Sequence, residues 1–195
     1  MRINPANAIS VLRACFAFWI AYLLLEVRTS PALVIAAAAV LVAILLDAFD
    51  GVIARQYGCM SKIGELSDIY ADHILANVLW VTLAYLGSVS IWVPLVTTTR
   101  DLTVDCMRQV HQCATNQNGF EQVRQTRLHW VVDSRFMRAF YGALKMFSWM
   151  ACIVSLYYPV GYVLQILVLF TVGICFVRAI PAVAASWRHV IFRPV

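Results

Sequence analysis

The chain has 195 residues, of which 62% are hydrophobic and only 13% are charged. A soluble domain has about 45–50% apolar and about 25% charged residues, so this composition excludes an ordinary soluble fold and indicates that lipid is the solvent for much of the chain. The net charge of +5 does not indicate nucleic-acid binding, because the basic residues are not clustered into a patch with interleaved aromatic residues.

Six apolar runs follow one another along the chain, and a membrane-spanning helix needs about 20 such residues. The first run lacks a small-residue cleavage site after it, so we expect it to be retained rather than removed as a signal peptide. Turn-forming residues separate the runs, among them Pro31, Gly87 and Pro159. The runs cover residues 9–25, 32–49, 69–88, 91–107, 136–158 and 160–185. The sequence therefore predicts an all-α integral membrane protein with six transmembrane helices, in which residues 1–195 form one membrane domain.

Positive charge predicts the orientation of these helices. Most arginines fall on the side of the N-terminus, whereas the opposite side carries only Arg28, next to Glu26. Arginine and lysine are enriched in cytoplasmic segments. We therefore expect both termini to be cytoplasmic.

Four aspartates between the second and third runs form the most informative pattern. Asp47 and Asp50 are three residues apart near the end of one predicted helix, and Asp68 and Asp72 are four residues apart near the start of the next. Each pair therefore shares one helix face. We expect a loop of about a dozen residues between the two helix ends to bring the pairs together.

Four carboxylates at one place indicate bound cations. Charged groups near a membrane are rare and usually functional, and ionised carboxylates repel one another. Oxygen ligands suit Mg²⁺, Mn²⁺ or Ca²⁺ rather than zinc, and two such ions typically hold a phosphoryl group between the attacking and leaving oxygens. Arg55 could bind a phosphate. The alternative is that the acids cap helices or pair with Arg55 and Lys62, which explains one or two acids more easily than four.

The segment resembles the signature of the CDP-alcohol phosphotransferase family, DxxDGxxARx₈GxxxDxxxD. Every fixed position matches, namely Asp47, Asp50, Gly51, Ala54, Arg55, Gly64, Asp68 and Asp72. The polar lead-in from Asn4 to Arg13 is also similar to the start of family members.

This resemblance implies a homodimeric, multi-pass enzyme of the bacterial cytoplasmic membrane, with its active site facing the cytoplasm. It implies two divalent cations, Mg²⁺ or Mn²⁺, held by Asp47, Asp50, Asp68 and Asp72. Asp72 would also be the general base. The CDP moiety of CDP-diacylglycerol would contact Asp47, Gly51, Ala54, Arg55 and Gly64.

The fourth run points to the acceptor alcohol. Arg100 and Arg108 are eight residues apart and lie close to one helix face, and a pair of arginines can hold an acceptor that carries a phosphate. Residues 100–108 resemble the phosphatidylglycerophosphate synthase branch, which implies glycerol 3-phosphate as the acceptor. Arg135, Arg138 or Lys145 could contact the same phosphate. The alternative for Arg100 is an Arg–Asp pair that holds helices together.

Two departures from that branch keep other acceptors open. The branch has a lysine after the last signature aspartate, where this chain has His73, and a GKxKT-like stretch where this chain has residues 134–138. An inositol phosphate acceptor would need a similar arginine cluster. A transporter with an acidic cluster is the alternative from another class, although its acids would more often lie at mid-membrane in two related halves, and no such repeat is visible.

Overall fold

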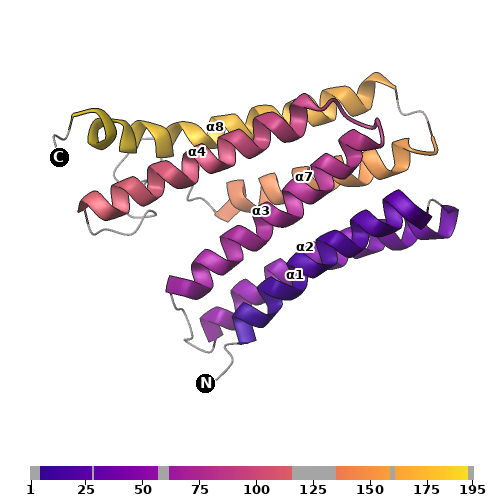
Figure 1. Ribbon diagram of the computed structural model, residues 1–195, viewed down its shortest axis with the longest axis horizontal. Helices are drawn as coiled ribbons and strands as arrows, with labels where there is room; N and C mark the ends of the chain where they lie inside the picture. Colours follow the sequence, from indigo (N-terminus) through magenta and orange to yellow (C-terminus); the bar gives the residue numbers. More distant parts are fainter. Residues whose placement is uncertain (1–4, 28, 57–61, 116–134, 159–160, 193–195) are drawn as a thin grey trace. The chain divides into compact units, whose positions relative to one another are not determined.

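The computed structural model describes residues 5–27, 29–56, 62–115, 135–158 and 161–192 (Figure 1). Within this part the chain forms six α-helices, one π-helical turn and no strand, so the predicted all-α class is confirmed. Within the helices, the side chains of residues 5–10, 30, 46–56, 62–66, 68, 108, 111–115, 135–136, 138, 182 and 185–192 lie outside the described part. The elements are α1 (Pro5–Tyr22), η1 (Leu23–Val27), α2 (Ser30–Gln56), α3 (Lys62–Tyr85), α4 (Trp92–Thr115), α7 (Arg135–Ser155) and α8 (Tyr162–Phe192).

One segment of the described residues, Tyr162–Pro181 in α8, is long and apolar enough to cross a membrane by length and composition. Pro31–Leu45 and Ala139–Ser155 are shorter apolar helices. The other predicted spans and the orientation of the termini stay predictions.

Helices α2 and α3 extend through most of the acidic signature. Because α2 ends at Gln56 and α3 begins at Lys62, only residues 57–61 separate them, and the predicted dozen-residue loop is wrong. The reason is physical: backbone hydrogen bonds continue a helix whether its side chains are apolar or polar, so the end of an apolar run does not mark the end of a helix.

The chain divides into two compact units, the first of which comprises Met1–Pro94 and Met146–Leu164. In this unit α1 packs against α2 and α3, and α1 and α3 run in the same direction (Figure 1). Each of the two helices has one stripe of residues along its packed side. The later members of each stripe follow its first residue by four, seven and eleven positions, which is the spacing of a single helix face. The stripes are Arg13, Ala17 and Ile20 on α1, continued by Leu24 of η1, and, after Asp72, Ala76, Leu79 and Leu83 on α3.

A glycine cap ends α3 and leads to a contact with α7. Gly87 has a φ of 79°, and the amides of Gly87 and Ser88 donate to the carbonyls of Ala84 and Leu83, each at 3.0 Å. This is the pattern in which a left-handed residue, usually glycine, terminates a helix. The Ser88 hydroxyl then donates to the carbonyl oxygen of Cys152 at 3.1 Å. The end of α3 is thereby joined to α7 within this unit.

The α3–α7 contact is reinforced by two aromatic side chains. Trp80 and Trp149 meet edge to face, with ring centroids 5.9 Å apart, and Trp149 is fully buried. Edge-to-face ring pairs contribute beyond the area that they bury. This pair therefore fixes the packing of α7 in the unit that holds the acidic signature.

The second unit comprises Leu95–Lys145 and Gln165–Val195. Its small apolar core contains Val104 of α4, with Ala179 and Val183 of α8. Pro181 is inside α8 and has no amide hydrogen, so one backbone hydrogen bond of this helix cannot form. Polar residues of α4, α7 and α8 gather in the same unit, as described below.

Candidate functional site

The acidic signature lies at matched heights on two consecutive helices. Asp50 is six residues before the end of α2 and Asp68 is six residues after the start of α3. At a rise of 1.5 Å per residue, both lie about 9 Å from the connection. Asp47 and Asp72 lie about 14–15 Å from it, again at similar heights. Since α2 returns toward the end at which α3 begins (Figure 1), the backbone favours convergence of the two pairs.

Most of the predicted ligands are described by their helix positions alone. Beyond the backbone, Asp47, Asp50, Gly51, Ala54, Arg55, Gly64 and Asp68 lie outside the described part. Among the described side chains, no group of three or more His, Cys, Asp or Glu residues could hold a metal ion. The donor set of the signature, four carboxylates on two helices, has the oxygen chemistry that Mg²⁺ and Mn²⁺ require. The residues therefore fit these ions, and the metal site stays a prediction.

Asp72 is the signature residue whose side chain lies within the described part of the structure. Its side chain is 41% exposed, and one carboxylate oxygen lies 3.7 Å from an Nη atom of Arg13, whose side chain is 1% exposed. The sequence placed Arg13 at the end of the lead-in that is similar to the start of family members, and no role at the site was predicted for it. Arg13 could have been recognised from the sequence by its spacing to Ala17, Ile20 and Leu24, which places it on the same helix face. A charged residue on a buried helix face needs a partner.

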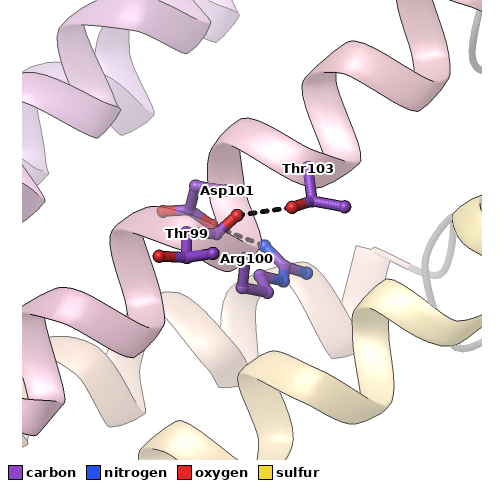
Figure 2. Close-up of polar contacts among 4 residues, drawn as sticks. All are labelled: Thr99, Arg100, Asp101 and Thr103. Atoms are coloured by element: carbon purple, nitrogen blue, oxygen red, sulfur yellow. Dashed lines mark hydrogen bonds and ion pairs between the residues drawn. The ribbon is translucent and has the colours of Figure 1, made fainter.

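Arg100 forms an ion pair with its neighbour in sequence. Figure 2 shows the guanidinium beside the Asp101 carboxylate, at 2.7 Å, with both side chains about 15% exposed. The pair lies within α4, so it does not itself hold two helices together. The Nε of Arg100 is buried and has no hydrogen-bond partner among the described residues. A buried donor without a partner is costly, and a bound anion or water is one way to satisfy it.

Further cations surround Tyr141 in the same unit. The guanidinium of Arg178 lies 4.7 Å from the Tyr141 ring centroid and the Lys145 ammonium lies 5.6 Å from it. Arg100 is within electrostatic range of Tyr141 and of Cys175. Helices α4, α7 and α8 thus bring three cationic side chains and the Asp101 carboxylate into the neighbourhood of Tyr141, so the cluster is positive overall. A site of this kind favours an anionic ligand.

Sequence analysis found only part of this cluster. Arg100 and Lys145 were predicted to contact the acceptor, whereas Tyr141 and Arg178 were not predicted. The signal for Arg178 was an arginine inside an apolar run, which is costly without a partner or polar surroundings. The side chains of Arg108 and Arg138 lie outside the described residues.

Comparison with known proteins supports the resemblance that the signature suggested. The chain matches the model of the CDP-alcohol phosphatidyltransferase family over residues 3–178. Two curated relatives, from Mycobacterium tuberculosis strains CDC 1551 / Oshkosh and ATCC 25618 / H37Rv, each bear the name "Probable phosphatidylglycerophosphate synthase". Each is 34% identical over 107 residues, which are 54% of this chain and 51% of the relative, so the chain spans about half the length of these relatives. Since the family match extends over most of the sequence, the chain belongs to the CDP-alcohol phosphatidyltransferase family.

Proposed function

We propose that this protein transfers the phosphatidyl group of CDP-diacylglycerol to glycerol 3-phosphate and releases CMP. The observation that carries the proposal is the intact eight-position signature on two consecutive helices, with its acids at matched heights. In this reaction the acceptor hydroxyl oxygen forms a bond to the β-phosphorus, and the bond from that phosphorus to the CMP oxygen breaks. The acceptor proton passes to Asp72, and CMP leaves with the bonding electrons.

Asp47, Asp50, Asp68 and Asp72 would hold two divalent cations, Mg²⁺ or Mn²⁺. When bound, the ions would neutralise the pyrophosphate and the leaving CMP. Asp47, Gly51, Ala54, Arg55 and Gly64 would bind the CDP moiety, whose approach the two glycines and the alanine permit because they are small. The exposure of Asp72 supports its assignment as base, since an acceptor hydroxyl can reach the carboxylate.

Glycerol 3-phosphate is proposed because a phosphate suits the cluster around Tyr141. The buried Nε of Arg100 can donate to a phosphate oxygen, and Arg178 adds a second guanidinium from α8. Arg108 and Arg138 are proposed to contribute to the same site. The names of the two relatives support this choice of acceptor. Inositol phosphate would place a similar charge in the cluster.

The proposed setting is the bacterial cytoplasmic membrane. Residues 1–195 would form a single multi-pass domain of six spans, assembled as a homodimer, with the site and both termini on the cytoplasmic side. Reporter fusions at the two termini test the orientation, and mass measurement in nanodiscs tests the dimer. Opposite reporter signals at the two termini would contradict the six-span topology.

A panel assay tests the function. Purified protein in nanodiscs would receive CDP-diacylglycerol, Mg²⁺ and, in turn, glycerol 3-phosphate, inositol phosphate, inositol and serine, with CMP release and lipid mass as readouts. We expect phosphatidylglycerophosphate as the product, and none with Asp72→Asn. Turnover of another alcohol would change the acceptor assignment alone. Ion flux without CMP release would contradict phosphatidyl transfer and favour a transporter.

A further inference from the structure

In the first unit, Arg13 of α1 is buried at the same height as Asp72 of α3, the proposed general base. Its side chain is 1% exposed, and it occupies the first position of a stripe whose other members are Ala17, Ile20 and Leu24. Asp72 occupies the equivalent first position on α3, ahead of Ala76, Leu79 and Leu83. The ion pair therefore lies where the apolar α1–α3 contact gives way to the acidic signature.

We infer that Arg13 is a positioning residue that holds the Asp72 carboxylate in the orientation that proton abstraction needs. This role rests on the proposed phosphatidyl transfer. The Arg13 guanidinium is buried and a buried charge needs a partner, so the packing of α1 on α3 holds it beside the Asp72 carboxylate, whose side chain is 41% exposed. The exposed part of the Asp72 side chain stays open to the acceptor, because Arg13 approaches from the packed side.

The 3.7 Å separation of Arg13 Nη and Asp72 Oδ is an ion-pair distance rather than that of a good hydrogen bond. Charge attraction of this kind limits the rotation of the carboxylate. Loss of orientation at a catalytic group affects the chemical step, and a displacement of about 1 Å can cost about 10²-fold in rate. Arg13 is thus expected to affect kcat rather than the binding of either substrate.

The test compares Arg13→Met, Asp72→Asn and the double variant in nanodiscs with CDP-diacylglycerol, glycerol 3-phosphate and Mg²⁺. For Arg13→Met we expect kcat to fall by about 10–100-fold, with KM for both substrates within about threefold of wild type. If Arg13 acts through Asp72, the double variant loses no more activity than Asp72→Asn alone. Binding of Mn²⁺ and of CDP-diacylglycerol, measured by calorimetry without turnover, should be unchanged in Arg13→Met.

Two further variants separate positioning from support of the fold. Arg13→Lys keeps the charge and should recover part of the lost kcat, and it replaces Arg13→Met in the comparison if the methionine variant does not fold. Thr82→Val removes another buried polar group of α3, far from Asp72, and should leave kcat unchanged.

Wild-type kcat in the Arg13 variants, additive losses in the double variant, or an effect confined to KM would each overturn this role while leaving phosphatidyl transfer intact. A wild-type protein that releases no CMP with any acceptor would overturn the proposed function and this inference with it.

Discussion

Replacement of Arg100 by methionine separates a structural from an acceptor-binding role of this residue. The change leaves the Asp101 carboxylate, 14% exposed, without the guanidinium that lies 2.7 Å away. Breaking a buried ion pair on one side costs about 3–5 kcal/mol, because the remaining charge stays desolvated. For a chain of this size, we expect the melting temperature to fall by about 6–20 °C.

The double variant Arg100→Met/Asp101→Val removes both charges. Replacing a buried pair with apolar residues of similar volume is often neutral for stability, so the melting temperature should return to within a few degrees of wild type. Acceptor binding should not return. A hydrogen bond to a charged group contributes about 1.5–3 kcal/mol, so KM for glycerol 3-phosphate should rise about 10–100-fold. KM for CDP-diacylglycerol should be unchanged.

The measurements are thermal unfolding in detergent and initial rates of CMP release in nanodiscs. Thr103→Ala is the matched control, since the Thr103 hydroxyl donates to the Thr99 carbonyl at 2.7 Å on the exposed side of α4 (Figure 2). This control should change stability by about 0.5 kcal/mol or less. A stable double variant with the wild-type KM for glycerol 3-phosphate would refute the acceptor role of Arg100. A double variant as unstable as Arg100→Met would refute the argument from the ion pair.

Three further predictions concern the base, the metal and the packing. Asp72→Asn should lower the rate of CMP release by about 10²–10⁴-fold, because an amide cannot take the acceptor proton, and near-normal turnover would rule out Asp72 as the base. Chelation by EDTA should stop CMP release and added Mg²⁺ or Mn²⁺ should restore it, whereas turnover without divalent ions contradicts the proposed metal site. Trp149→Ala should lower the free energy of unfolding by about 3–5 kcal/mol, since this fully buried ring packs on Trp80. The exposed Trp92 is the control, and equal losses in Trp92→Ala and Trp149→Ala would contradict the packing argument.

The six helices could be predicted from the apolar runs, but their ends could not. Hydrophobic composition reports which part of a helix prefers lipid, whereas the helix continues as long as its backbone hydrogen bonds form. Helix α2 therefore continues past the second apolar run to Gln56, and α8 continues to Phe192. Gly87 was predicted as a breaker, and its left-handed φ explains why α3 ends there.

The signature acids could be placed on shared helix faces by their spacing alone. Their matched heights became visible only with the helix ends known. Arg13 could have been suspected from its position on a buried stripe, but its partner on α3 depends on how two helices pack. The approach of Arg178 to Tyr141 depends likewise on tertiary contacts between α7 and α8, which local spacing does not determine.

Binding of Mn²⁺ tests most directly the claim that the acids of α2 and α3 form one cation site. The protein in nanodiscs would be titrated with Mn²⁺ in the presence of a CDP-alcohol, and bound ions would be followed by electron paramagnetic resonance. We expect two ions per chain with the dipolar coupling of metals about 3.5–4 Å apart, lost in Asp47→Asn and in Asp68→Asn. A single ion, two uncoupled ions, or binding unchanged in these variants would contradict the two-cation site.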